Sequence, residues 1–226
     1  MTVSSLLESA VQDAVLESLP RDIGHILAEQ IRSSSVLDEV AADAQAYADR
    51  DPACGHDARN IVVAITSFQA VLHYRVAHWV LGLPETHPEI ASARDALLFA
   101  LMITSRGKLL SHSDIHPKAV IGSSFVIDHG IGNVIGETCQ IGDNVYCNGG
   151  VIFGSSRIFG NQTNKRHPTI GDNVQFGGMV GVYGNITIGS DSFIGARCTV
   201  TRDVSPSSKV VLISEQQVTR PYELEA

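Results

Sequence analysis

The chain has 226 residues and a formal net charge of −8, with 44% hydrophobic and 18% charged residues. These proportions are typical of a compact soluble protein, and the acidic balance argues against binding to nucleic acid. No apolar run reaches the roughly 20 residues of a membrane-spanning helix, and no basic segment of a signal peptide opens the chain. The four cysteines form no closely spaced pair, so we expect reduced thiols, no metal site and a cytoplasmic location.

The first half of the chain has the period of α-helices. Apolar residues recur three and four positions apart from Leu6 to Val15, and further helices are expected over residues 35–49, 61–81 and 87–110. The segment 61–81 is apolar around most of its circumference, so we expect it at the centre of this half.

From Asp114 onward the period changes to six residues. Between residues 170 and 200 the repeat runs without a slip through Ile170, Phe176, Val182, Ile188, Ile194 and Val200. A period of six fits neither a helix nor an amphipathic strand, but it fits a solenoid in which each unit forms one side of a triangular coil. About 18 residues make one coil, so this half holds roughly five coils.

The sequence therefore predicts an α+β protein with three parts. We expect a helical N-terminal domain over residues 1–112, a parallel β-helix over 113–212 and a C-terminal tail over 213–226. A repeat scaffold says nothing about function by itself, so the informative positions are those that interrupt the repeat.

Three segments do so. They are Asp114-Ile115-His116-Pro117, then Asp128-His129-Gly130 with a two-residue offset after it, and the loop from Gly154 to Lys165 that leads into Arg166-His167-Pro168. An Asp-His pair on a coil of aliphatic and small residues is unfavourable unless it has a function.

The order and spacing of these motifs resemble the serine O-acetyltransferase family. The matching segments read DIHP, DHG, VIGET, IGDNV and RHP, and they are preceded by Arg50-Asp51-Pro52-Ala53 and the stretch from Tyr74 to Trp79, which resemble the family's helical domain. The resemblance covers about residues 45 to 205. It implies that the β-helix is left-handed and that the protein moves the acetyl group of acetyl-CoA to the hydroxyl of L-serine.

The chemistry of that reaction gives each motif residue an expected role. A hydroxyl that attacks a thioester must lose its proton, and imidazole is the side chain suited to accept it at neutral pH, so His129 is the expected general base. By resemblance, Asp114 orients and stabilises this imidazole. The resemblance also implies that Asp51 and Asp128 face the ammonium and hydroxyl of the acceptor, while Arg166 and His167 hold its carboxylate.

The resemblance further implies where the co-substrate binds and how the chains assemble. Acetyl-CoA would lie in a groove between adjacent β-helices, with its pantetheine arm along Gly154, Gly178 and Ala196 and a backbone N–H at the Gly154 turn facing the thioester oxygen. Such a groove implies a homotrimer, and the helical halves join two trimers into a hexamer in this family. The chain ends Glu-Leu-Glu-Ala instead of in the isoleucine that docks into the sulfhydrylase of cysteine synthesis, which argues against that complex.

Departures from the family pattern keep other interpretations open. The loop reads Gly154-Ser155-Ser156-Arg157, and the usual end of the solenoid is replaced by Val210-Val211-Leu212-Ile213. The basic candidates for the coenzyme phosphates are Arg157, Lys165, Arg197 and Lys209. An acetyltransferase of the same fold that acts on another small amino acid or an amine is the alternative function. A non-catalytic scaffold and a three-histidine metalloenzyme fit less well, since the Asp-His pair is present and the histidines are otherwise explained.

Some of the same residues also have plain structural interpretations. Asp51 precedes a proline and suits a turn. We expect His116, His73 and His78 to be packing or surface residues.

Overall fold

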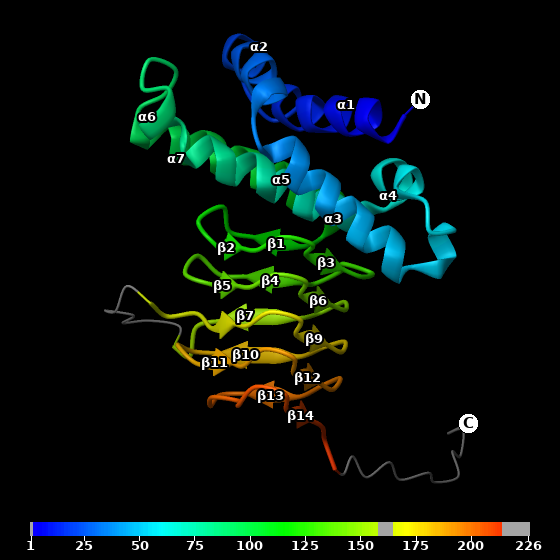
Figure 1. Ribbon diagram of the computed structural model, residues 1–226. Helices are drawn as coiled ribbons and strands as arrows, with labels where there is room; N and C mark the ends of the chain where they lie inside the picture. Colours follow the sequence, from blue (N-terminus) through cyan, green and yellow to red (C-terminus); the bar gives the residue numbers. More distant parts are fainter. Residues whose placement is uncertain (1, 158–164, 214–226) are drawn as a thin grey trace, which may run out of the picture.

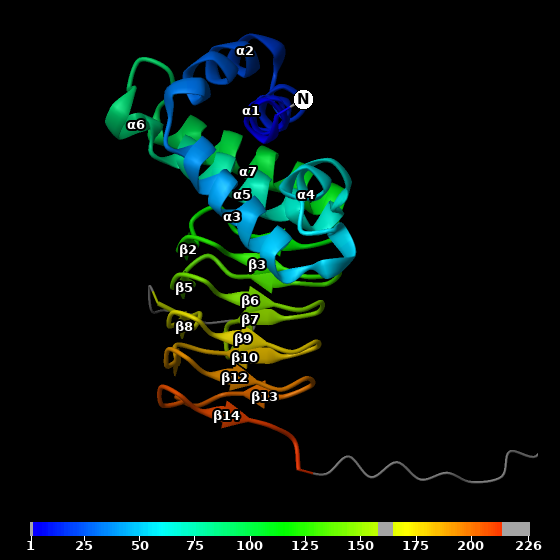
Figure 2. The same ribbon diagram turned by 45° about the vertical axis from the view of Figure 1, so that its right-hand side comes forward.

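The computed structural model describes residues 2–157 and 165–213, and it has two parts stacked on each other. Helices from the first half of the chain form a cluster at one end, and a column of parallel coils extends from it (Figures 1 and 2). The coil that contains β1, β2 and β3 lies directly against the helices, and β14 lies at the far end.

The helices of the first part end one residue before His112. They are α1 (Val3–Leu16), α2 (Arg21–Gln30), α3 (Val36–Arg50), α4 (Ala58–Ala64), α5 (Thr66–Leu81), α6 (Leu83–Thr86) and α7 (Ala93–Ser111), with short 3₁₀ turns η1 (Ile31–Ser33) and η2 (Pro52–Cys54). Within the described residues, no helix has the length and apolar character needed to cross a membrane.

The predicted helix over 61–81 is wrong as one continuous element. Ile65 leaves the helical conformation with φ −91° and ψ 108°, which ends α4 and starts α5 in a new direction. As expected, α5 is central: Leu72, Tyr74 and Val76 are fully buried. Opposite it, α7 approaches closely because Gly107 has no side chain, and a Cβ there would lie 2.6 Å from the Cβ of His73.

Two other helix predictions differ from the structure. The helix expected over 87–110 begins later, because the Ser92 hydroxyl accepts a hydrogen bond from the Asp95 N–H and so caps α7. α2 was not predicted at all, although Ile23, Leu27 and Ile31 have the four-residue spacing of one helix face.

The second part consists of short strands that stack in parallel. They are β1 (Asp114–Ile115), β2 (Val120–Ile121), β3 (Val126–Ile127), β4 (Val134–Ile135), β5 (Gln140–Ile141), β6 (Tyr146–Cys147), β7 (Ile152–Gly154), β8 (Thr169–Ile170), β9 (Gln175–Phe176), β10 (Gly181–Tyr183), β11 (Thr187–Ile188), β12 (Phe193–Ile194), β13 (Thr199–Val200) and β14 (Lys209–Val210). Every strand pairing between neighbouring coils in the described residues is parallel, for example Ile115 with Ile135 and Ile135 with Phe153.

These strands form three faces of a prism. Face A has the order β1-β4-β7-β10-β13, face B has β11-β8-β5-β2, and face C has β14-β12-β9-β6-β3. The chain turns from face A to face B at the AB corner, which includes residues 116–119, 136–139, 155–157 and 165–168. It turns from face C to face A at the CA corner, which includes residues 128–133, 148–151, 177–180 and 195–198.

The interior of the prism is a column of apolar side chains. The second residue of most strands is buried there, and Phe153 and Phe176 meet edge to face with their ring centroids 5.0 Å apart. The six-residue period predicted this inward position in each unit. The free thiols of Cys139, Cys147 and Cys198 share this interior, where they pack as small apolar groups.

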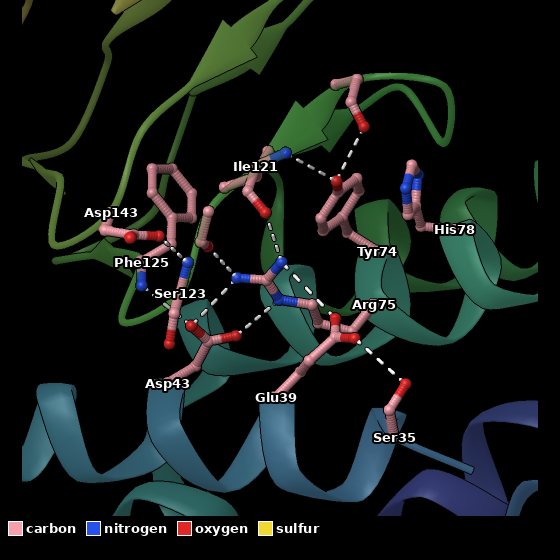
Figure 3. Close-up of polar contacts among 12 residues, drawn as sticks. Ser35, Glu39, Asp43, Tyr74, Arg75, His78, Ile121, Ser123, Phe125 and Asp143 are labelled. Atoms are coloured by element: carbon pink, nitrogen blue, oxygen red, sulfur yellow. Dashed lines mark hydrogen bonds and ion pairs between the residues drawn. The ribbon is translucent and has the colours of Figure 1, made fainter. Parts of the chain in front are cut away.

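Side chains from α3 and α5 cover the open end of the prism (Figure 3). The Tyr74 hydroxyl donates to the Ala119 carbonyl at 2.7 Å and accepts from the Ile121 N–H at 3.1 Å. Arg75 donates to the Ile121 carbonyl and to both oxygens of Asp43. These bonds satisfy backbone groups of the first coil that have no further coil to pair with.

Candidate active site

A pocket of about 500 Å³ lies where the helical part meets the CA corner of the first coil. Its lining comes from the end of α3, from η2, from the break between α4 and α5, and from the end of β3: Arg50, Asp51, Pro52, Ala53, Ala64, Ile65, Thr66, Ser67, Asp128 and His129. The helix break at Ile65 therefore helps to form this pocket, and three of the residues expected in the site lie in it.

His129 occupies the corner itself. Its backbone is left-handed, with φ 61°, and its side chain is 79% exposed. The next residue, Gly130, also has a positive φ, and a Cβ there would lie 2.5 Å from the Cβ of Ser67, so no other residue fits between the corner and α5. His129 Nε2 lies 3.7 Å from Asp128 Oδ2.

Asp51 enters the pocket from the helical part. Its carboxylate accepts from the Ala53 N–H at 2.8 Å, which caps η2, and the Cys54 thiol donates to its other oxygen at 2.9 Å. The thiol hydrogen bond, with further backbone hydrogen bonds, lowers the pKa of Asp51. Asp51 therefore has the turn role suggested for it and also presents a carboxylate to the pocket.

Asp114 begins β1, next to the same corner, and its N–H donates to the Asn133 carbonyl. Its side chain faces the end of α7, where Lys108 Nζ donates to Asp114 Oδ2 at 2.6 Å. The structure thus places Asp114 close to the CA corner with its carboxylate directed to Lys108 and not to His129.

Arg166 and His167 lie at the other corner. At the AB corner, Arg166 forms an ion pair with Glu137, and His167 Nδ1 is the acceptor for the Thr138 N–H at 3.1 Å. The hydrogen bond from Arg166 lowers the pKa of Glu137, while burial lowers the pKa of His167 to about 4 and keeps its imidazole neutral.

The residues expected to bind the coenzyme divide between the same two corners. Gly178 and Ala196 belong to the CA corner, where the Gly178 carbonyl accepts from the Arg197 N–H at 2.9 Å. Gly154 ends β7 on the AB side, level with Tyr183 of β10. Within one chain, the pocket brings together Asp51, Asp128 and His129. Gly178 and Ala196 lie at the same corner in later coils. Three further expected residues lie on the other side of the prism: Gly154, Arg166 and His167.

The basic candidates for the coenzyme phosphates have contacts within the chain. Lys165 Nζ donates to the Thr138 carbonyl at 2.7 Å, and Lys209 Nζ lies 5.7 Å from the centre of the Phe193 ring. Arg197 follows Ala196 at the CA corner. Most of the long loop and the tail lie outside the described residues, at 158–164 and 214–226. The expectation about the C-terminal residues of the chain therefore also lies outside the described residues.

Sequence reasoning missed two residues at the pocket. Arg50 lines it, and its Nη2 donates to Asn144 across the boundary between the two parts. Tyr146 donates to Asp128 Oδ2 at 2.6 Å from the coil below. Arg50 lies in the Arg50-Asp51-Pro52-Ala53 segment, whose pattern indicates no role for it. The position of Tyr146 beside Asp128 follows from the strand alternation only once the coils are stacked. In the described part of the chain, no cluster of three His, Cys, Asp or Glu side chains has a metal-binding arrangement.

Comparison with known proteins places the chain among acyl-transferring relatives. A model of the bacterial transferase hexapeptide (six repeats) matches residues 167–202. The serine acetyltransferase of Mycobacterium tuberculosis is 38% identical over 183 residues, which are 81% of this chain and 73% of the relative. Serine acetyltransferase 4 of Arabidopsis thaliana is 36% identical over 80% of this chain, which spans 46% of that longer relative.

Solved structures agree with this similarity. A soybean serine acetyltransferase in complex with serine superposes with a TM-score of 0.73 and 32% identity over 91% of this chain and 79% of the other. A serine acetyltransferase in complex with CoA superposes with a TM-score of 0.72 and 26% identity over 93% of this chain and 84% of the other. The predicted fold class, a helical N-terminal part followed by a left-handed parallel β-helix, is confirmed.

Proposed function

Since the chain belongs to the serine acetyltransferase family, we propose that it transfers the acetyl group of acetyl-CoA to the hydroxyl of L-serine. The observation that carries this proposal is the convergence of Asp51, Asp128 and His129 on one pocket. A zwitterionic acceptor with a hydroxyl needs carboxylates near its ammonium and a base near its hydroxyl, and this pocket supplies both.

His129 is the general base in this proposal. Its imidazole accepts the proton of the serine hydroxyl while the oxygen attacks the thioester carbonyl of acetyl-CoA. When the C–S bond breaks, the imidazolium returns that proton to the departing CoA sulfur, so no acyl-enzyme is needed. Holding the two substrates together supplies a large part of the rate, because a bimolecular reaction becomes an intramolecular one.

We retain Asp114 as the proposed partner of this imidazole, although its carboxylate faces Lys108 in the structure. The exposed position of the pair supports a movement, since both side chains are about half exposed, at 56% and 47%. An exposed ion pair contributes little free energy, so the carboxylate can leave it when the imidazole becomes charged.

The division of residues between two corners supports an assembly in which neighbouring chains complete each site. In a cyclic trimer the CA corner of one chain can face the AB corner of the next, which brings His129 and Asp128 toward the next chain's Gly154, Arg166 and His167. Gly178 and Ala196 would then border the same groove as that Gly154. We propose a homotrimer with acetyl-CoA in this groove and the acceptor carboxylate held by Arg166 and His167.

The helical part supports a further contact between trimers. Leu98, Leu101 and Leu109 of α7 are 53%, 38% and 72% exposed and lie on one side of the helix. A second trimer that packs on this face would bury them, so we propose a dimer of trimers. The free thiols of the described residues support a reducing, cytoplasmic setting.

The release of CoA thiol with different acceptors tests the function. We expect efficient release with L-serine and poor release with homoserine, threonine and simple amines. Efficient turnover of an amine or an alcohol without a carboxylate, together with poor turnover of serine, would overturn the proposal in favour of another acceptor.

A further inference from the structure

Tyr146 stands on the outer side of face C, one coil below the pocket. Its strand β6 pairs with β3, where Tyr146 lies level with Val126, and with β9, where it lies level with Gln175. The neighbouring Cys147 is buried in the prism with 1% exposure. Side chains alternate along a strand, so the ring of Tyr146 extends outward from the face.

The hydroxyl of Tyr146 reaches up to the end of β3. It donates to Asp128 Oδ2 at 2.6 Å, and this same oxygen lies 3.7 Å from His129 Nε2. The phenol therefore engages the carboxylate oxygen that faces the imidazole. Asp128 also lines the pocket.

Arg50 holds the other side of this arrangement. Its guanidinium carbon lies 5.7 Å from the centre of the Tyr146 ring, and its Nη2 is fixed by Asn144. Its Nη1 is buried and has no hydrogen-bond partner in the described part of the chain. Desolvation raises the pKa of Tyr146, and the hydrogen bond to Asp128 adds to this, so the hydroxyl stays protonated as a donor at neutral pH.

We propose that Tyr146 is a positioning residue of the acceptor site: its hydroxyl fixes the Asp128 carboxylate so that one oxygen faces His129 and the other faces the acceptor's ammonium. This inference rests on the proposed function and adds a specific role within the same pocket. Without the hydroxyl the carboxylate can rotate about its side-chain bonds, and the acceptor must then order it on binding. Tyr146 does not itself touch the reacting atoms.

Tyr146→Phe tests the role, because it removes only the hydroxyl and keeps the ring that packs on Arg50. A hydrogen bond to a charged group predicts that the acceptor KM rises about tenfold or more. We expect kcat to change much less and the acetyl-CoA KM to stay the same. Gln175→Ala is the matched control, since it shortens the neighbouring exposed side chain of face C and should leave all three constants unchanged. An unchanged acceptor KM in correctly assembled Tyr146→Phe overturns the proposal.

A second comparison distinguishes positioning from general support of the fold. If Tyr146 acts through Asp128, the acceptor KM of Tyr146→Phe/Asp128→Asn equals that of Asp128→Asn alone. Independent, multiplied effects of the two substitutions would overturn the proposal. If the unmodified enzyme releases no CoA with serine, the proposed function fails and no acceptor KM can be compared. The urea midpoints of the same variants then test the Tyr146–Asp128 contact. Non-additive changes in the midpoint support this contact, and additive changes overturn the proposal.

Discussion

The left-handed backbone conformation of His129 is shared by other residues of the CA corner. Gly132, Gly150, Met179 and Arg197, each two residues before the next strand, are also left-handed, with φ values of 81°, 76°, 61° and 64°, and His129 precedes this position in the longer turn of the first coil. A non-glycine residue in this region is disfavoured by roughly 1–2 kcal/mol, yet the stacked coils impose it repeatedly. The backbone conformation at this corner thus sets the direction in which the His129 side chain leaves the chain.

His129→Ala should lower kcat by at least about a hundredfold, since it removes the proposed base. His129→Asn should lower it similarly and fold at least as well, because asparagine tolerates the left-handed conformation. Turnover is measured as CoA release, and light scattering checks that the assembly is intact. Near-normal turnover in an intact assembly would remove His129 from the role of base.

Buried His73 should make stability depend on pH. Desolvation lowers its pKa from the ordinary 6.5 to about 4, and its Nδ1 lies 2.7 Å from the Gln69 carbonyl oxygen. The unfolded chain therefore binds a proton that the folded chain does not, and stability falls as the pH drops from about 6.5 toward 4. At pH 5 the loss is about 2 kcal/mol relative to pH 8.

Urea unfolding of His73→Gln measures this contribution. The variant should be less stable at pH 8 because of altered packing, but its stability should fall less between pH 8 and pH 5 than that of the unmodified chain. His87→Gln is the control, since that imidazole is 40% exposed. Equal pH dependence in His73→Gln and the unmodified chain would contradict the role of His73.

At the scale of elements, α3 and α5 act as a cap for the β-helix. A solenoid exposes unpaired backbone groups and apolar side chains at each end, and a terminal element must cover them. Here the covering groups are polar side chains: Tyr47 accepts from the Ile127 N–H at 2.9 Å, and Asp43 accepts from the Phe125 N–H at 2.8 Å. The first coil, which carries Asp128 and His129, is therefore fixed to the helix that ends at Arg50.

Arg75→Met should destabilise the protein strongly. Arg75 is 4% exposed and pairs with Asp43, which is 0% exposed, so the substitution leaves a buried carboxylate without its cation (Figure 3). Breaking one partner of such a pair destabilises by about 3–5 kcal/mol, measured as the free energy of unfolding. Arg75→Met/Asp43→Leu should recover part of that loss.

Arg59→Met is the matched control, because Arg59 pairs with Asp57 on the surface with 59% of its side chain exposed. It should leave the unfolding free energy nearly unchanged. An Arg75→Met variant as stable as Arg59→Met would show that the buried pair does not hold the cap.

The sequence predicted the elements whose pattern is periodic and local. The six-residue repeat predicted the strands from Ile170 to Val200 closely, because the inward-facing apolar residue of each unit can be identified from that unit alone. The helical period could not locate the break at Ile65, since the residues on both sides favour a helix. Motifs predicted roles for His129 and Asp128. Tyr146 and Arg50 join the candidate site only because the coils stack and α3 docks on the first coil, which no local sequence pattern indicates.

At the scale of the whole molecule, the two corners of the prism carry the two halves of the proposed interfacial site. The corner with His129 and Asp128 lacks a cation for the acceptor's carboxylate other than Arg50, among the residues that line its pocket. At the corner with Arg166 and His167, the positive charge of Arg166 is balanced by Glu137. A contact between unlike corners closes into a three-membered ring when its rotation is about 120°, which is the symmetry of the proposed trimer.

Mixed assemblies test this arrangement directly. His129→Ala and Arg166→Ala chains, each assembled alone, should be nearly inactive with serine well below its KM, since every site lacks either the base or the carboxylate ligand. Co-expression in equal amounts should restore about a quarter of the activity of the unmodified enzyme, because three in four random trimers are mixed and each mixed trimer has one interface at which both residues are intact. The control mixes the two proteins after assembly, when chains no longer exchange. If His129 and Arg166 of the same chain formed the site, no mixture would regain activity, so a co-expressed sample no more active than its parents would contradict the interfacial site.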